Sequence, residues 1–173
     1  KLYKIQRSYI STFQVGKLNI FDNLHKTIDL LDTYKLSLTY SDLYLQVFAF
    51  LNTQNRVRSE EQKQEWEVFM QNPLLQQLPE NATFHTCLHF YLTHFAYHAI
   101  MLNHEEQGRY IKLVMELWDA HPHIKKEQLI IFLSALNNYF IYCYANNLLK
   151  EFERYLNVQT ITGTSTSVQA VWF

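Results

Sequence analysis

Residues 81–103 read NATFHTCLHFYLTHFAYHAIMLN, and this stretch decides the fold. Its apolar side chains recur every three or four positions, as a helix requires. One stripe holds Phe84, Leu88, Tyr91, Phe95 and Leu102, and a second holds Phe90, Tyr97 and Met101. A helix that is apolar on nearly every side must be covered by neighbouring elements. We therefore expect a buried helix in the middle of an all-α fold.

The chain that follows continues the helical pattern. Glu105–Ala120 is amphipathic and ends before His121-Pro122, because proline cannot continue a helix. Lys125–Asn147 is again apolar all round, so we expect it to be sandwiched between neighbours. Leu148–Val158 returns to the amphipathic type.

The chain that precedes it also predicts helices. Lys1–Val15 has apolar residues at helical spacing, and Leu18–Leu38 carries a stripe of Phe21, Leu24, Ile28, Leu31 and Leu38. Ser41 is expected to cap a separate helix over Asp42–Asn52. Ser59 with Gln62 fits a capping box at the start of the next helix, which Asn72-Pro73 ends.

Composition supports an all-α class. The 173 residues include only 3 Gly and 3 Pro, whereas sandwiches and barrels draw on these residues for their many turns. We expect antiparallel helix pairs stacked as a short right-handed α-solenoid, with a closed helical bundle as the alternative. The predicted domain spans residues 1–158, and the polar run 159–173, rich in Ser and Thr, is a linker or C-terminal tail.

Two of the amphipathic segments end alike, and this suggests a repeat. Glu65–Pro73 resembles Val114–Pro122, with an aromatic residue four positions before each proline and the prolines 49 positions apart. The pattern over Ser41–Val158 resembles tetratricopeptide-like and related α-solenoid repeats, whose period of about 34 residues is shorter. The resemblance implies a curved scaffold whose concave face binds a peptide or a partner protein.

Charge and cysteine usage narrow the function classes. The net charge is −1 and the basic residues are scattered, which argues against nucleic acid as a partner. Cys87 and Cys143 form no metal-site spacing, and we expect both to be buried thiols of a cytoplasmic protein. The apolar segments are too short and too polar for membrane spans, so no membrane is expected as a partner. A place within a larger chain stays open.

The histidines are the strongest candidates for chemistry. His94 and His98 lie one turn apart on the predicted central helix and are weak candidates for metal ligands. His85 and His89 face the opposite side of that helix, so one metal cannot gather all four. No H-E-x-x-H, no Gly-rich phosphate loop and no G-x-S-x-G is present. The sequence therefore predicts no enzyme and no cofactor.

The first functional hypothesis is a protein- or peptide-binding scaffold. Tyr91, His94, His98, Asn138 and Tyr142 are the predicted groove residues, since amide and imidazole groups can hydrogen-bond a peptide beside aromatic rings. The second is a helical bundle that holds a metal or small ligand through His94 and His98. The third is an oligomerising piece of a larger chain, which exposed apolar faces at Leu2–Phe13 or Val168–Phe173 would support.

Overall fold

The computed structural model describes Lys4, residues 20–148, and residues 150, 151, 153 and 155. Within these residues every regular element is a helix, which confirms the all-α class. The helices are α2 (Ile20–Gln54), α3 (Glu60–Met70), α4 (Pro73–Gln76), α5 (Phe84–Ile100), α6 (His104–Ala120), α7 (Pro122–Glu127) and α8 (Leu129–Ala145). The chain divides into two compact units, Lys1–Gln107 and Gly108–Phe173.

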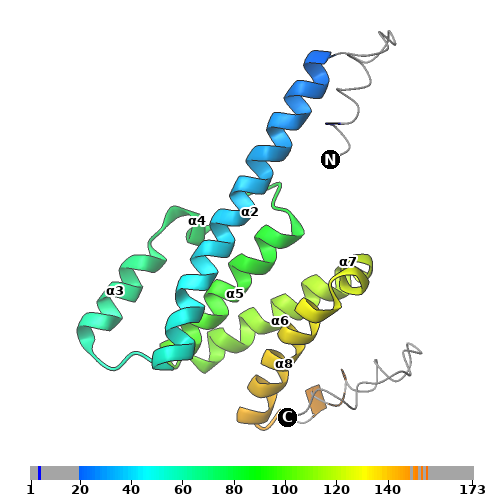
Figure 1. Cartoon of the computed structure of the whole chain (residues 1–173). Coiled ribbons are helices and arrows are strands. Elements are labelled where there is room, and N and C mark those ends of the chain that lie inside the picture. The colour runs from blue at the N-terminus through cyan, green and yellow to red at the C-terminus, as the bar shows by residue number, and fades with distance from the viewer. Residues whose placement is uncertain (1–3, 5–19, 149, 152, 154, 156–173) are drawn as a thin grey trace. The chain divides into compact units, whose positions relative to one another are not determined.

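In the first unit, α2 and α5 lie side by side and run in the same direction (Figure 1). At the start of α5, the Ser37 hydroxyl lies 3.1 Å from the hydroxyls of both Thr83 and Thr86. At the other end, the backbone N–H of Val57 donates to the carbonyl of Ile100 over 3.0 Å. Because the two helices are parallel, α3 and α4 form the return connection between them.

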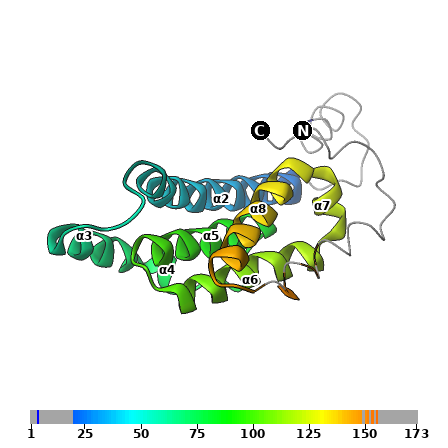
Figure 2. The same ribbon diagram turned by 90° about the horizontal axis from the view of Figure 1, so that it is seen from below.

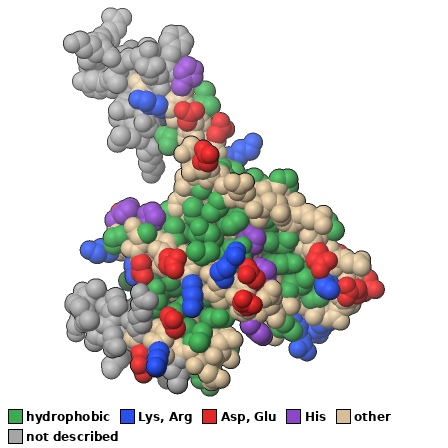
Figure 3. Space-filling view, turned by 180° about the vertical axis from the view of Figure 1, so that it is seen from behind, with side chains coloured by type: hydrophobic (Ala, Val, Ile, Leu, Met, Phe, Trp, Pro, Cys, Tyr) green, Lys and Arg blue, Asp and Glu red, His purple; other side chains and the backbone are tan. Residues whose placement is uncertain are grey.

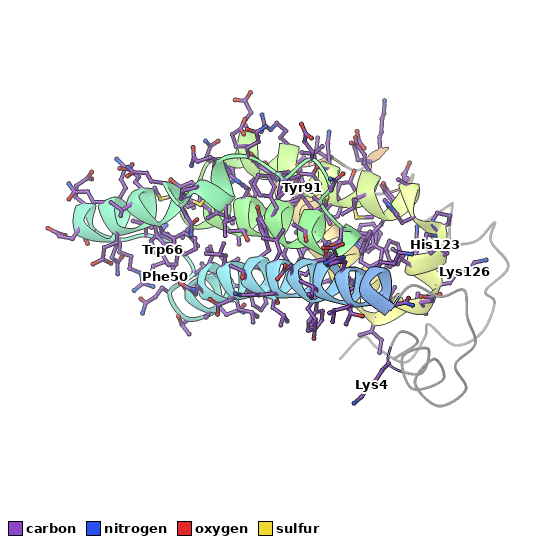
Figure 4. The ribbon with its side chains drawn as sticks, turned by 90° about the horizontal axis from the view of Figure 1, so that it is seen from above. Lys4, Phe50, Trp66, Tyr91, His123 and Lys126 are labelled. Atoms are coloured by element: carbon purple, nitrogen blue, oxygen red, sulfur yellow. The ribbon has the colours of Figure 1, made fainter. Side chains whose placement is uncertain are left out.

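The core of the first unit closes where α3 meets the end of α2. Val47, Ala96 and Ile100 are fully or almost fully buried at its centre. Trp66 of α3 packs edge-on against Phe50 of α2, with ring centroids 5.1 Å apart (Figure 4). Aromatic pairs of this kind bury large areas, so this contact fixes α3 on α2.

The second unit is built on α6 and α8, which the short α7 joins (Figure 2). Trp118 of α6 is fully buried and packs edge-on against Phe132 of α8, with ring centroids 5.7 Å apart. Gly108 makes a notch for Tyr142, because a Cβ at this position would overlap the Tyr142 hydroxyl. A bulky aromatic side chain thus fits against the helix backbone.

One local prediction at the N-terminal side is wrong. Ser41 does not cap a new helix, because α2 runs unbroken from Ile20 to Gln54 through that position. No Gly or Pro interrupts this stretch, and a single Ser costs a helix interior little. The apolar stripe noted on Leu18–Leu38 lies largely in solvent: Leu31 is 61% exposed and Leu38 is 52% exposed.

Other boundaries agree with the sequence. The N-cap at Ser59 is confirmed, because Ser59 Oγ accepts the N–H of Gln62. The Gln62 side chain accepts the N–H of Arg58, one residue before the one a capping box uses. Asn72 caps α4 and places Pro73 in its first turn. α6 ends at Ala120 before His121-Pro122, as predicted. The expected sandwiching of the last long helix is wrong, because one face of α8 is exposed.

Several predictions fall outside the described residues. These are the helix over Lys1–Val15, apart from Lys4, the tail over 159–173, and the apolar segments Leu2–Phe13 and Val168–Phe173. The described residues 150, 151, 153 and 155 are helical. The division into 1–158 and 159–173 stays a prediction. Within the described part of the chain, no helix is both long and apolar enough to cross a membrane.

The long helices α2, α5 and α8 end in the same way. Each is followed by a residue with positive φ: Asn55 (67°), Leu102 (56°) and Asn147 (56°). After α5, the N–H of Leu102 bonds to Ala99 and that of Asn103 to His98, which is a Schellman motif. After α8, the corresponding bonds run from Asn147 to Tyr144 and from Leu148 to Cys143. The left-handed position is occupied twice by Asn, which tolerates it, and once by Leu.

Replacing the strained leucine is expected to stabilise the protein. Leu102→Asn keeps the left-handed turn with a residue suited to it, and Leu102 is already 52% exposed. We expect the free energy of unfolding to rise by about 0.5–1 kcal/mol, measured by urea denaturation. Val68→Asn is the matched control, because Val68 is 65% exposed but lies inside α3. A loss of stability in Leu102→Asn would contradict the inference that the left-handed backbone at Leu102 is strained.

Candidate functional site

The first three predicted groove residues lie on α5. His94 is buried (8% exposed), whereas Tyr91 and His98 are half-buried. The His94 Nε2 lies 3.0 Å from the carbonyl oxygen of Leu75, and since a carbonyl only accepts, this nitrogen carries the proton. The His94 ring stacks on His98 with centroids 6.3 Å apart. Figure 4 places Tyr91 on the same helix.

The other two, Asn138 and Tyr142, lie on α8 and are half-buried. Tyr142 reaches the notch at Gly108, so its ring serves the packing of α8 on α6. The five residues therefore form two sets, one in each compact unit. Four of them retain exposed surface, whereas His94 is engaged inside a helix contact. The partner-binding role of this group stays a prediction.

The histidines do not form a metal centre in the described residues. No group of three or more His, Cys, Asp or Glu side chains there is placed to hold a metal ion. His94 also directs its Nε2 proton at Leu75, so that nitrogen has no lone pair to offer. A metal bound by His94 and His98 would need the Nδ1 atom of His94 and ligands from elsewhere.

His89 is the titratable group with the most unusual surroundings in the first unit. Its ring stacks on Tyr44 with centroids 5.9 Å apart, and its Nδ1 is buried without a hydrogen-bond partner. Burial lowers the pKa of His89, and the neighbouring His85 lowers it further, while a backbone hydrogen bond of His85 opposes both. Burial also raises the pKa of Tyr44 to about 12. The pair is a neutral stack, which suits packing.

The second unit contains a polar hollow that sequence reasoning missed. Its volume is about 480 Å³, and its lining is Lys112, Met115, Glu116, Asp119, Tyr139, Glu151 and Tyr155. The only signal for it in the sequence is the spacing of Lys112, Glu116 and Asp119, which puts them on one face of α6.

Tyrosine hydroxyls already hold two carboxylates of this hollow. Tyr139 donates to Glu151 and Tyr155 donates to Asp119, each over 3.0 Å. The Nζ of Lys112 lies 3.8 Å from the Glu151 carboxylate, and the Nζ of Lys125 lies 3.1 Å from the Asp119 carboxylate. Burial and the bond to Glu151 raise the pKa of Tyr139, so it stays protonated. These hydrogen bonds and ion pairs hold Glu151 against α6 and α8, and Tyr155 against α6.

The third candidate is the exposed side of α8. Ile130, Leu133, Asn137, Ile141 and Tyr144 recur at helical spacing, and we name this set the α8 outer face. Ile130 is 84% exposed, Tyr144 79% and Ile141 60%. The opposite side carries the buried Phe132, Leu136 and Tyr139. A folded helix with so much apolar surface in solvent is typical of an interaction site.

The chain was compared with models of known protein families, with curated proteins and with solved structures, and none of them matches it. The function of this chain is therefore inferred from its own geometry.

The stack of His89 on Tyr44 predicts a pH dependence of stability. Because the pKa of His89 is lowered in the folded state, the unfolded chain binds more protons once the pH falls below the ordinary value of 6.5. The contribution of His89 is thus complete above pH 6.5 and declines as the pH falls toward the folded pKa.

We expect the loss of unfolding free energy between pH 7.5 and 5.5 to be smaller in His89→Gln than in the wild type. Urea denaturation at the two pH values measures it. His25→Gln, at an exposed position of α2, is the control for removing a histidine from the chain. An identical pH dependence in all three proteins would show that the pKa of His89 is the same in the folded and in the unfolded chain.

Proposed function

We propose that the chain is a non-enzymatic module that binds a partner protein or peptide through exposed helix faces. The observation that carries the proposal is the α8 outer face, where apolar side chains recur on a helix whose other side is fixed in the core. A partner that covers such a face removes apolar surface from water, and this burial stabilises the complex by about 25 cal/mol for each Å² of apolar surface.

The chemistry of the face fits an amphipathic helix as the partner. Its residues follow the spacing of three and four that a second helix can match with its own apolar stripe. Asn137 is exposed in the middle of the face, and its amide can both donate and accept. A polar residue inside an apolar helix contact favours one register of the partner.

The stacked-repeat architecture is part of the proposal, and the spacing of the helix ends supports it. α2, α5 and α8 end at residues 54, 100 and 145, which are 46 and 45 positions apart. The parallel course of α2 and α5, with α3 returning between them, is what two first helices of successive pairs would adopt. A closed bundle remains the alternative arrangement.

The predicted groove residues Tyr91, His98, Asn138 and Tyr142 remain candidates for contacts with the partner, whereas we assign His94 to the fold. The alternative function, metal or small-ligand binding through His94 and His98, has less support because the Nε2 of His94 donates to Leu75. We place the module in the cytoplasm, where the free thiols of Cys87 and Cys143 would stay reduced.

The α8 outer face is tested first for whether it is open in solution. Because Ile141 is 60% exposed, Ile141→Asp is expected to change the free energy of unfolding by less than about 0.5 kcal/mol. Lys126→Asp introduces the same carboxylate side chain at an exposed position of α7 and serves as the control. Urea denaturation of both variants makes the comparison. A loss of 2 kcal/mol or more, on the order of a buried charge, would show that the chain itself covers the face.

Binding is tested with the same two variants. Proteins captured by the wild-type chain are identified by mass spectrometry, and the leading candidate is purified and titrated directly. We expect Ile141→Asp to weaken that affinity roughly tenfold or more, as loss of a central apolar contact does, and Lys126→Asp to leave it unchanged. Equal affinities for both variants would remove the α8 outer face from the binding site.

A further inference from the structure

A second apolar surface lies on the long helix of the first unit. We name as the α2 seam the residues Leu24, Ile28, Leu31, Lys35, Leu38, Asp42 and Leu45. Their spacing alternates strictly between four and three positions over three heptads, which is the repeat of a two-stranded coiled coil. The five apolar members are 36–61% exposed. The seam therefore has the pattern of one helix of a two-stranded coiled coil, and no second helix covers it within this chain's described residues.

The seam faces away from the packing of the first unit. Tyr40, Leu43 and Val47, which lie on the other side of α2, are buried at 0–7% exposure. Before Ser37, where contact with α5 begins, α2 projects beyond α3, α4 and α5 of the same unit (Figure 1). In the space-filling view, hydrophobic side chains reach the surface of this projecting end among charged ones (Figure 3). A helix can approach the seam without displacing α5.

The two charged members of the seam decide which partner fits. Lys35 and Asp42 occupy equivalent heptad positions and both are exposed. The Asp42 carboxylate accepts only from the Gln46 amide, over 2.9 Å, among the bonds that the structure describes. In a parallel pair of identical helices, equivalent positions meet, so lysine would face lysine and aspartate would face aspartate. In an antiparallel pair, Lys35 of one copy lies within reach of Asp42 of the other.

The length of α2 fits the same antiparallel register. Pairing Lys35 with Leu38 of the second copy, and Leu31 with Asp42, places the two-fold axis between Leu36 and Ser37. That point coincides with the middle of α2, which runs from Ile20 to Gln54. The two helices then overlap along their whole length of about 50 Å. Six of the seven seam residues meet a seam residue of the other copy, and Leu24 meets Ala49.

We propose that the α2 seam binds a second copy of this chain as an antiparallel two-stranded coiled coil, held in register by two ion pairs between Lys35 and Asp42. The interface is isologous, as a two-fold dimer requires. It lies in a different compact unit from the α8 outer face. Dimerisation through α2 and partner binding through α8 can therefore be tested with separate variants, and the failure of one proposal does not decide the other.

The test is sedimentation equilibrium of the full chain over a range of concentrations. The wild type is expected to dimerise. Lys35→Asp and Asp42→Lys should each weaken the dimer roughly tenfold or more, because each puts like charges at both pairing sites. The double variant, Lys35→Asp with Asp42→Lys, should restore wild-type association, since the exchanged pairs are again opposite in sign.

The controls separate this geometry from others. Lys26→Asp reverses a charge on α2 outside the seam and is expected to leave association unchanged. Leu31→Gln, which is uncharged, should also weaken the dimer, and circular dichroism should show unchanged helix content because Leu31 is 61% exposed. A parallel dimer would associate equally well as wild type, as Lys35→Asp and as the double variant, and that result would overturn the proposal.

Two further outcomes would also overturn it. A wild-type chain that stays monomeric at every concentration would exclude a second copy as the occupant. If Leu31→Gln also lowered the free energy of unfolding of that monomer by 2 kcal/mol or more, on the order of a lost core contact, another part of the same chain would be the occupant.

Discussion

Two neighbouring carbonyl groups, those of Leu74 and Leu75, tie the first unit together. They belong to α4, a helix of four residues whose carbonyls have few partners within the helix. The Tyr40 hydroxyl from α2 donates to Leu74 over 2.8 Å, and the Nε2 of His94 from α5 bonds to Leu75 over 3.0 Å. A buried carbonyl left without a donor costs about 1–3 kcal/mol, so the return connection holds both long helices in place.

This constraint explains the polar residues of a helix that is otherwise apolar. His94 satisfies a backbone carbonyl outside its own helix, and the Thr93 hydroxyl donates to the carbonyl of His89 within it. Buried polar groups need such partners. His94 therefore serves the packing of α5 on α4. Candidates for recognition lie instead on helix faces that packing leaves open, on α2 and α8.

Much of the fold was predictable from the sequence because its signals are local. The N-cap at Ser59, the proline at residue 73 and the apolar period of α5 each act within one or two turns. The continuity of α2 was missed because serine is a preferred N-cap residue but costs a helix interior little, so Ser41 is compatible with either place.

The candidate surfaces were less predictable, and the reason is physical. A stripe such as Leu24, Ile28 and Leu31 looks the same whether it meets its own chain or another molecule, since burial in either place releases the same surface from water. Only the structure shows that α5 covers the opposite side of α2. The seating of Tyr142 at Gly108 is also invisible in sequence, because it joins positions that are 34 residues apart.

The two open faces differ in their polar residues, and this difference bears on specificity. Apolar side chains alone would let α2 and α8 accept the same partners, since hydrophobic contact is not directional. The α2 seam carries Lys35 and Asp42, which favour a partner with the opposite order of charges, and an antiparallel copy of α2 supplies that order. The α8 outer face carries only the neutral Asn137, which rejects neither charge but disfavours a purely apolar partner. In the proposed arrangement, the charge-patterned face serves self-association and the neutral face serves partner binding, so the two do not compete.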